Sequence, residues 1–293
     1  MKKFILILTL IVSGCSEKEN EQRISNNVLI PELVGELDVS ESSGLISLQN
    51  HLVTHNDSGG DNSLYVINKN NAIGLSELIL TNTTNIDWED ITSDSDYIYV
   101  GDFGNNNGDR ENLAIYKIPI PNNIEINQEL VNSEKISFKY NNQTSFITAP
   151  TNTNFDAEAL ALYNDKLYLF SKNWKNQQTD IYEIPNSVGD FSVLKIGNIN
   201  VKGLITGATY DLNSNLMILV GYNDFNPFVI TLRNIQGINF AQASIKKYTI
   251  NIPSGISPQI ESICIFNDDI YLTSEVLFGL KAYLFKIKIN SLN

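Results

Sequence analysis

Three glutamates, Glu89, Glu158 and Glu261, occupy the same place in three copies of one sequence pattern. Each stands two residues before an apolar residue that recurs seven positions later, as Ile91 and Ile98 do. Carboxylates brought close together cannot all stay ionised unless a cation or a shared proton compensates them. Carboxylate oxygens are also ligands that Ca²⁺ prefers. The three glutamates are therefore the predicted metal ligands, with Ca²⁺ as the predicted cofactor.

Other polar side chains in the repeats extend this candidate site. Candidate ligands for a metal or a bound molecule are Asp57, Asp102 and Glu275, and candidates for binding a substrate are Arg110, Lys172, Trp174 and His55. Positive side chains suit an anionic group, and a tryptophan ring suits stacking. The sequence has no nucleophile-elbow motif and no zinc motif, so it assigns no catalytic residue.

A structural role for the same carboxylates is the alternative. Carboxylates at the start of a strand can accept backbone N–H groups from a neighbouring unit and hold the units together. Shared protons, or pairing with Lys172 or Arg110, would also relieve the repulsion between them. The sequence leaves these alternatives open.

Five copies of the pattern organise the chain, and they begin at Glu41, Asp87, Asp156, Ile205 and Gln259. In each copy an apolar strand, a polar turn and a second strand are followed by a third strand and usually by a fourth. β-Branched and aromatic residues at alternating positions favour strands, and no stretch after residue 25 has a helical period. Four strands repeated about every 50 residues predict an all-β fold, a single β-propeller of five four-stranded blades. A sixth blade within residues 120–155 is left open, since one clear strand is visible there.

The last copy lacks a fourth strand, because the sequence ends at Asn293. The segment Val28–Val39 precedes the first copy and has no partner there. We expect this N-terminal segment to supply the missing outer strand. It would then close the ring and cover an exposed sheet edge.

In a propeller the starts of the inner strands meet on one face, around the central axis. Glu89, Glu158 and Glu261 should therefore converge there, although they are far apart along the chain. Ser43 takes the equivalent place in the first copy and Thr206 in the fourth, so the ring of acids is incomplete.

The N-terminal residues carry targeting signals. A basic start and an apolar run over residues 1–14 indicate a lipoprotein signal peptide, and small residues before Cys15 are typical of an acylated cysteine. Residues 15–27 would form the acylated cysteine and a polar tether, with the propeller domain over 28–293. Acyl chains such as palmitate would anchor the protein to the outer membrane, on the periplasmic side or at the cell surface. An ordinary secretory signal with a chance cysteine is the alternative.

The net charge of −13 argues against a nucleic-acid partner, because nucleic-acid binding needs basic patches. Cys264 is the one cysteine besides Cys15, so an intramolecular disulfide is excluded after processing. It lies within an apolar strand, and we expect it to be a small buried side chain.

The motifs "ESSGL", "THNDSGG", "DWEDI", "GDFGNNNGDR", "DAEAL" and "TDIYEIP" resemble those of bacterial secreted propellers. This group includes the esterase-like domain of certain phytases and the SdiA-regulated lipoproteins. The resemblance runs from about residue 28 to residue 289, and it implies a propeller, an extracytoplasmic location and bound Ca²⁺. It does not imply one activity, because one fold hosts many functions.

Two functions follow from these observations. The first is a membrane-anchored propeller whose acidic rim binds a small molecule, a glycan or a protein, through Ca²⁺. The second is a metal-dependent hydrolase, resembling a phosphoesterase or a lactonase, that uses the same rim. The sequence leaves open whether the protein is an enzyme.

Overall fold

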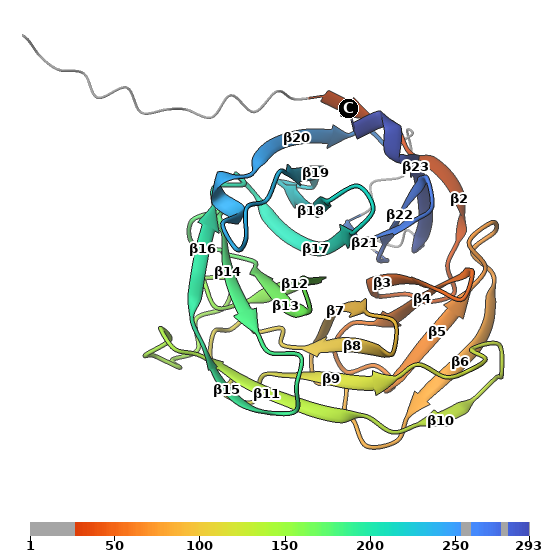
Figure 1. The fold of residues 1–293 in the computed structure, drawn as a ribbon, viewed down its shortest axis with the longest axis horizontal. Helices are drawn as coiled ribbons and strands as arrows, with labels where there is room; N and C mark the ends of the chain where they lie inside the picture. The colour runs from red at the N-terminus through yellow and green to blue at the C-terminus, as the bar shows by residue number, and fades with distance from the viewer. Residues whose placement is uncertain (1–26, 253–258, 277–280, 293) are drawn as a thin grey trace, which may run out of the picture.

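Five β-sheets surround one axis and form a five-bladed β-propeller (Figure 1). The structure is a computed structural model, and it describes residues 27–252, 259–276 and 281–292. The predicted signal peptide, Cys15 and most of the polar tether lie outside these residues. The predicted all-β fold and the count of five blades are confirmed.

Each blade contains four antiparallel strands, numbered from the axis outward in the order of the sheet. Blade 1 contains β3 (Ser42–Leu48), β4 (His51–Asn56), β5 (Ser63–Ile67) and β6 (Gly74–Leu80). Blade 2 contains β7 (Trp88–Ser93), β8 (Tyr97–Asp102), β9 (Ala114–Pro119) and β11 (Glu134–Tyr140). Blade 3 contains β12 (Ala157–Tyr163), β13 (Lys166–Ser171), β14 (Thr179–Ile184) and β16 (Lys195–Ile199). Blade 4 contains β17 (Leu204–Asp211), β18 (Leu216–Asn223), β19 (Asn226–Arg233) and β20 (Ser244–Ile250). Blade 5 contains β21 (Ile260–Phe266), β22 (Asp269–Ser274), β23 (Tyr283–Lys288) and β2 (Glu32–Glu36).

Blade 5 is closed by an N-terminal strand, as predicted. β2 pairs antiparallel with β23, with Leu33 opposite Phe285. The last described residues therefore lie beside the first strands (Figure 1). The predicted closing segment is nevertheless divided, because its first part belongs to β1 (Asn27–Leu29), which pairs with β20 of blade 4. Pro31 lies between the two strands, and proline cannot donate a hydrogen bond to a sheet.

Three sheets gain a fifth strand that runs parallel to their outer edge. Besides β1 on blade 4, β10 (Glu129–Val131) pairs with β6 of blade 1 and β15 (Gly189–Val193) pairs with β11 of blade 2. Each added strand covers part of an edge that would otherwise present unpaired backbone groups. Residues 120–155 contribute β10 and β11 to blades 1 and 2, so they form no sixth blade.

The apolar core lies between neighbouring sheets. Trp88 is fully buried and packs with Ile46, Val53 and Val100 between blades 1 and 2, as expected for this residue. Two short 3-10 helices, η1 (Phe240–Gln242) and η2 (Ile289–Leu292), complete the described structure. Among the described residues, no helix has the length and hydrophobicity needed to cross a membrane.

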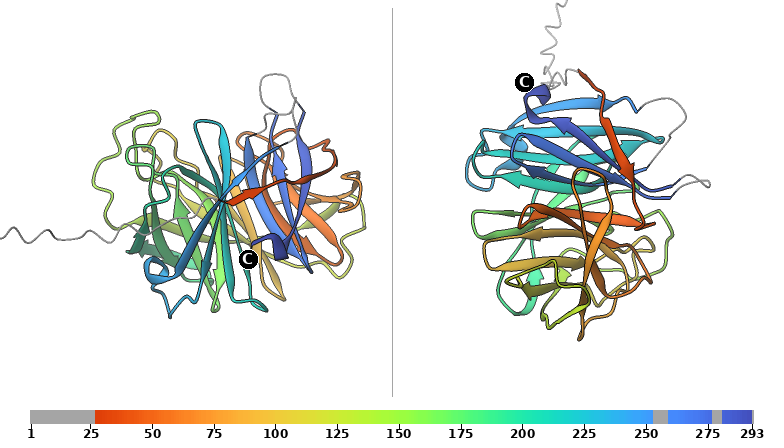
Figure 2. Two further views of the ribbon diagram at one scale, coloured as in Figure 1. Left: turned by 90° about the horizontal axis from the view of Figure 1, so that it is seen from above. Right: turned by 90° about the vertical axis from the view of Figure 1, so that its right-hand side faces the viewer.

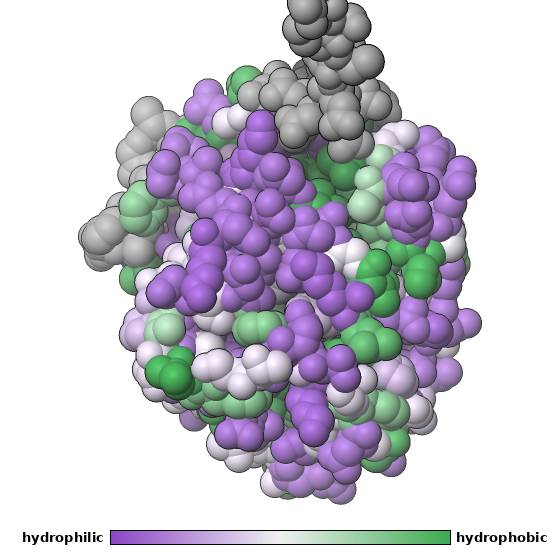
Figure 3. Space-filling model, turned by 90° about the vertical axis from the view of Figure 1, so that its left-hand side faces the viewer, coloured by the Kyte–Doolittle hydropathy of each residue, from purple (hydrophilic) through white to green (hydrophobic). Residues whose placement is uncertain are grey.

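The surface of the ring is mostly polar. The side views show the blades stacked around the ring, with loops on both faces of it (Figure 2). One flank of the molecule is mainly hydrophilic, and apolar side chains are scattered over it (Figure 3). Scattered apolar side chains are normal on soluble domains and need no partner.

One buried carboxylate connects three inner strands at the axis. Asp90 of β7 is fully buried, and it accepts the N–H groups of Ile91 at 2.8 Å, Leu160 of β12 at 2.7 Å and Ala208 of β17 at 3.1 Å. Burial raises the pKa of Asp90 well above its usual range, while these three N–H donors oppose the shift. Blades 2, 3 and 4 are thus held together by one side chain.

Hydroxyl groups connect the two blades that meet where the ring closes. Ser42 and Thr54 of blade 1 share a hydrogen bond of 2.7 Å, and the Ser42 hydroxyl donates to Thr273 of blade 5 at 2.8 Å. Thr273 also contacts the hydroxyl of Ser262. All four side chains are buried, so they satisfy one another across the closure.

Replacing Asp90 by alanine should lower the free energy of unfolding by about 3 kcal/mol, because buried N–H donors would lose their acceptor. Urea denaturation of the purified domain measures this change. Asp96→Ala is the control, since Asp96 is exposed in the turn between β7 and β8. A loss of less than about 1 kcal/mol in Asp90→Ala would show that this residue does not hold the hub together.

Candidate functional site

One mouth of the central channel forms an acidic pocket with a volume of about 430 Å³. It is lined by Ser43, Asp57, Glu89, Asn106, Thr151, Glu158, Lys172, Trp174, Tyr222, Phe225, Gln259, Glu261 and Glu275. Glu89, Glu158 and Glu261 come from three different blades, so the predicted convergence of these residues is confirmed. Lys172 and Trp174 follow β13, Asp57 follows β4 and Glu275 follows β22.

A β-bulge aims each of the three glutamates into the pocket. In β7, Trp88 pairs with Asp102 and Asp90 pairs with Gly101, which leaves Glu89 between them without a partner in the ladder. The same shift in register leaves Glu158 unpaired in β12 and Glu261 unpaired in β21. A bulge adds one residue on one strand and redirects its side chain, and it is common beside functional sites.

The two copies without a glutamate use the equivalent position to connect blades. The Ser43 hydroxyl donates to the carbonyl oxygen of Glu89 at 2.6 Å, and the Thr206 hydroxyl donates to the carbonyl oxygen of Ile260 at 2.9 Å. The structural alternative therefore describes Ser43, Thr206 and Asp90, whereas the side chains of the three glutamates remain in the pocket.

Lys172 and Glu158 form a buried ion pair. Lys172 Nζ lies 2.6 Å from both carboxylate oxygens of Glu158, and it lies 5.0 Å and 5.4 Å from the ring centres of Trp174 and Tyr222. Burial disfavours the charged lysine, but Glu158 and Glu261 outweigh this effect and raise the pKa of Lys172 well above its usual range. Lys172 thus remains charged and compensates Glu158.

Asp156 is a site residue that is absent from the sequence candidates. It is fully buried, and it accepts the Trp174 Nε1–H at 2.7 Å and the Asn105 N–H at 2.7 Å. It thereby fixes the orientation of the Trp174 ring at the pocket wall. Its place two residues before Glu158 was the available sequence signal.

Arg110 and Asp102 do not line the pocket, so their predicted roles on the rim need correction. Arg110 Nη2 lies 2.8 Å from Asp102 Oδ1, and its Nη1 donates to the Gly104 carbonyl at 2.7 Å. The carboxylate of Asp102 is almost fully buried. This pair fixes the loop after β8, because two buried opposite charges stabilise each other only in close contact.

His55 also does not reach the rim, and its prediction as a rim residue is wrong. The side chain is fully buried, and its ring packs edge-on against Trp88 with 5.7 Å between the centroids. Nδ1–H donates to the Asn56 carbonyl at 3.0 Å, and burial lowers the pKa of His55 to about 4. The imidazole is therefore neutral and forms part of the interface between blades 1 and 2.

A compact group of carboxylates lies on the side of blades 1 and 2. One oxygen from each of Asp57, Asp87 and Glu89 lies within 4.8 Å of the others. Gly104 packs directly against this group, and a Cβ on Gly104 would lie only 2.0 Å from Glu89 Oε1 and 2.4 Å from Asp87 Oδ2. Asp87 was not among the sequence candidates, although its position two residues before Glu89 was the signal that could have found it.

The pocket holds more negative charge than its lysine can neutralise. Burial and neighbouring carboxylates raise the pKa of Asp57 to about 7 and that of Asp87 to about 6, the latter against the opposing effect of Arg110. The same causes raise the pKa of Glu261 and of Glu275 to about 7 and that of Glu89 well above its usual range. A bound cation would relieve this repulsion, so the donor set fits a cation with oxygen ligands.

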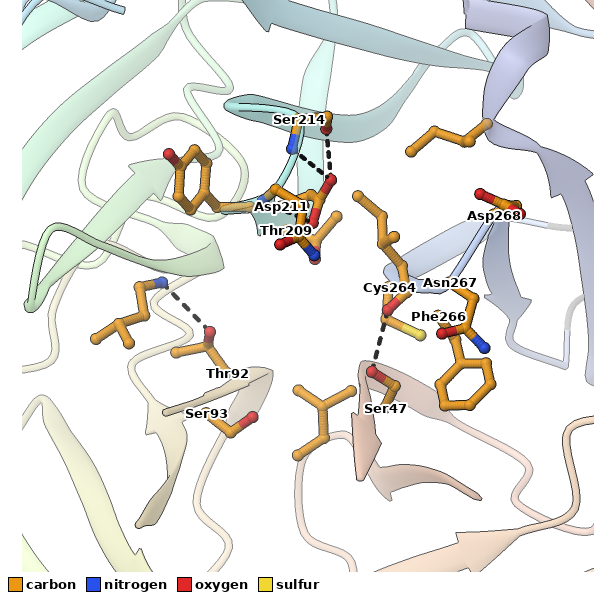
Figure 4. Close-up of a pocket in the computed structure, with 16 residues that line it drawn as sticks. Ser47, Thr92, Ser93, Thr209, Asp211, Ser214, Cys264, Phe266, Asn267 and Asp268 are labelled. Atoms are coloured by element: carbon orange, nitrogen blue, oxygen red, sulfur yellow. Dashed lines mark hydrogen bonds between the residues drawn. The ribbon is translucent and has the colours of Figure 1, made fainter. Parts of the chain in front are cut away.

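A larger cavity of about 1020 Å³ lies at the opposite mouth of the channel (Figure 4). Its wall is formed by the far ends of the inner strands and by turns. Asp211 is occupied in one such turn, where it accepts the N–H groups of Asn213 and Ser214. Cys264 is buried there as expected, and burial and Asp90 raise the pKa of its thiol. This cavity is larger but offers no group of uncompensated charges comparable to that of the acidic pocket.

The fold is similar to that of solved glycoside hydrolases. A variant of the exo-β-1,3-galactanase from Phanerochaete chrysosporium with β-1,3-galactotriose superposes with a TM-score of 0.52 at 11% identity, over 89% of this chain and 64% of that chain. The same enzyme with galactose gives a TM-score of 0.51 at 11% identity, over 87% and 64% of the two chains. The chain thus spans 64% of the length of these structures, and at such identity the likeness shows the fold alone.

No family model matches the sequence, and no curated protein matches it. The resemblance to the phytase and SdiA-regulated propellers therefore stays a prediction. What the structure and the comparisons establish together is a five-bladed β-propeller with a fold like that of a glycoside hydrolase.

The raised pKa values predict that stability without divalent cations falls as the pH rises from about 5 to about 8. The folded protein holds protons on Glu261 and Glu275 up to a pKa of about 7, whereas the unfolded chain loses them near the ordinary glutamate pKa of 4.5. Folding therefore takes up protons in this window, and deprotonation destabilises the folded state. Melting temperatures measured with a chelator over this range test the effect.

Glu261→Gln should flatten the pH profile of the melting temperature, because glutamine has no proton to lose. The exposed Glu134→Gln in β11 is the matched control and should leave the slope unchanged. A melting temperature that rises with pH in the chelated wild-type protein would show that the pocket carboxylates are not destabilised by their burial.

Proposed function

We propose that this chain is an extracytoplasmic, membrane-anchored β-propeller that binds a small molecule or a glycan in the acidic pocket, with the help of Ca²⁺. One observation carries the proposal. Oxygens of Asp57, Asp87 and Glu89 lie within 4.8 Å of one another, and Asp57 and Glu89 line a pocket of about 430 Å³. Pockets of this volume suit small ligands better than a protein surface.

Asp57, Asp87 and Glu89 would hold the cation. They differ from the predicted set, because Glu158 already pairs with Lys172, whereas Asp87 contributes a carboxylate to the compact group. Carboxylate and amide oxygens suit Ca²⁺, which accepts irregular geometry. When bound, the ion would supply positive charge that neutralises the buried carboxylates, and it would offer a site for ligand hydroxyl groups.

The remaining wall favours a neutral or positively charged ligand over an anion. Lys172 is the one cationic side chain of the pocket lining, and it is compensated by Glu158. Trp174, Tyr222 and Phe225 add ring surface to the wall. Aromatic rings stack on apolar faces while carboxylates accept hydrogen bonds, and this combination suits a polyhydroxylated molecule.

Anchoring through Cys15 places this pocket outside the cytoplasm in our proposal. The support comes from the sequence, where a basic start, an apolar run and small residues precede Cys15 in the order of a lipoprotein signal. Labelling cells with an azide- or alkyne-bearing palmitate analogue tests the anchor. Cys15→Ser should abolish the label and release the protein from the membrane fraction.

Hydrolysis in the same pocket is a second candidate function. Burial and neighbouring charges raise the pKa of Glu261 to about 7, and a carboxyl group with such a pKa can act as a general acid near neutral pH. Because the solved structures with this fold include an exo-β-1,3-galactanase, glycosides are the first substrates to test. Phosphate esters fit less well, since the charge around them would be mostly negative.

Calcium should raise the melting temperature of the purified domain, and Asp87→Asn or Glu89→Gln should abolish the increase. The reason is that each variant removes one carboxylate from the group that would bind the ion. Thermal unfolding with and without Ca²⁺ measures the effect, with the exposed Asp96→Asn as the matched control. An unchanged calcium response in both pocket variants would refute the metal site.

If the second candidate is correct, the wild-type protein should release nitrophenol from at least one member of a panel of nitrophenyl glycosides. Glu261→Gln should then lower kcat by at least about a hundredfold, because it removes the general acid. Nitrophenyl phosphate and lactones belong in the same panel. The absence of turnover on every substrate, with and without Ca²⁺, would leave binding as the function.

A further inference from the structure

The acidic pocket has a second part, on the side of blades 4 and 5, where negative charge is not compensated. Glu261 opens β21 and Glu275 follows β22, and both side chains line the pocket. Lys172 is bound to both carboxylate oxygens of Glu158, so it does not pair directly with either of them. Among the described residues, neither belongs to the compact group of Asp57, Asp87 and Glu89.

Glu261 supplies an observation that points to a ligand. Its side chain is only 5% exposed, and its Oε1 has no hydrogen-bond partner in the described structure. A buried carboxylate oxygen without a donor is costly, so native proteins rarely keep one without a function. A positively charged donor in the pocket would satisfy it.

Aromatic side chains form the wall beside these two carboxylates. Tyr222 and Trp174 already face the cationic Nζ of Lys172 at 5.4 Å and 5.0 Å from their ring centres. Phe225 lines the same pocket, and it remains 57% exposed. Carboxylates next to ring faces suit an organic cation, whose apolar parts contact the rings while its N–H groups reach the oxygens.

The backbone at Phe225 supports a functional role for this side chain. Asp224 and Phe225 form the two-residue turn between β18 and β19, with φ of 47° and 64°. Such turns favour Asn or Gly, because a bulky residue at positive φ is strained. Local strain of this kind is found mainly where it positions a residue for function.

We propose that the pocket binds a small organic ammonium ion, with its charged group between Glu261 and Glu275 and its apolar part against Phe225 and Tyr222. The inference rests on the proposed binding function of the same pocket and names the class of ligand. A second metal ion fits this part less well, since the rings of Tyr222 and Phe225 offer it few oxygens.

Glucosamine and glucose provide a matched pair of probes, because they differ only in an amine and a hydroxyl at one carbon. In isothermal titration calorimetry with saturating Ca²⁺, glucosamine should bind at least about tenfold more tightly than glucose, which corresponds to about 1.4 kcal/mol. Glu261→Gln should remove this preference while the protein stays folded, because glutamine keeps the shape of the side chain. Asp87→Asn is the control, and it should keep the preference while losing the calcium response.

Phe225→Asn separates binding from folding. Asparagine accepts positive φ, so the variant should unfold at the same temperature as the wild type or higher, yet bind glucosamine several-fold more weakly. Equal affinities of the wild-type protein for glucosamine and glucose would overturn the inference. So would the absence of binding for glucosamine, ethanolamine and 1,5-diaminopentane alike. A calcium response without amine preference would contradict the ligand class and leave the metal site intact.

Discussion

The buried carboxylate of Asp90 is the constraint on which the arrangement of the hub depends. A ring of five blades brings the inner strands together at one axis, where backbone N–H groups face inward and water has little access. Asp90 meets this requirement for three strands at once, by accepting N–H groups from β7, β12 and β17. Hydroxyl groups of Ser42, Thr54 and Thr273 perform the corresponding task where blades 1 and 5 meet. Buried backbone groups are rarely left unpaired, so these polar side chains fix the relative positions of the inner strands.

With the hub fixed, the bulges at the start of the inner strands gain a defined direction. Each bulge leaves one residue outside the ladder and turns its side chain toward the pocket. Three of these residues are glutamates, whereas Ser43 and Thr206 donate to backbone carbonyls of the next blade. The same structural position thus serves either cohesion between blades or the chemistry of the pocket, depending on whether its side chain is short or long.

The pocket concentrates charge at a cost to the folded state. Lys172 neutralises Glu158, and the Arg110–Asp102 pair stabilises the neighbouring loop, but the other carboxylates face one another. Such an arrangement is unfavourable unless protons or a bound cation compensate it. Proteins accept unfavourable local electrostatics mainly at functional sites, and this supports a binding or catalytic role for the acidic pocket rather than for the larger cavity at the opposite mouth.

The sequence by itself determined the fold and the three converging glutamates. The seven-residue step from Leu45 to Leu52, and its recurrence at Ile91, Leu160 and Ile263, defines strand pairs whose starts must meet once the ring closes. The unpartnered segment before the first copy likewise predicted the closing strand β2. These features are local or periodic, so they can be recognised without knowing any distance in space.

Only the tertiary structure decided which charges compensate one another. The bulges change the alternation of inward and outward side chains, so that Asp87 joins Glu89 while Asp90 turns into the hub. His55 falls in the interface between two blades, and Arg110 binds Asp102 instead of a ligand. These outcomes depend on distances of a few ångström between residues from different strands and loops. A linear pattern does not contain such distances, because they arise when the sheets pack together.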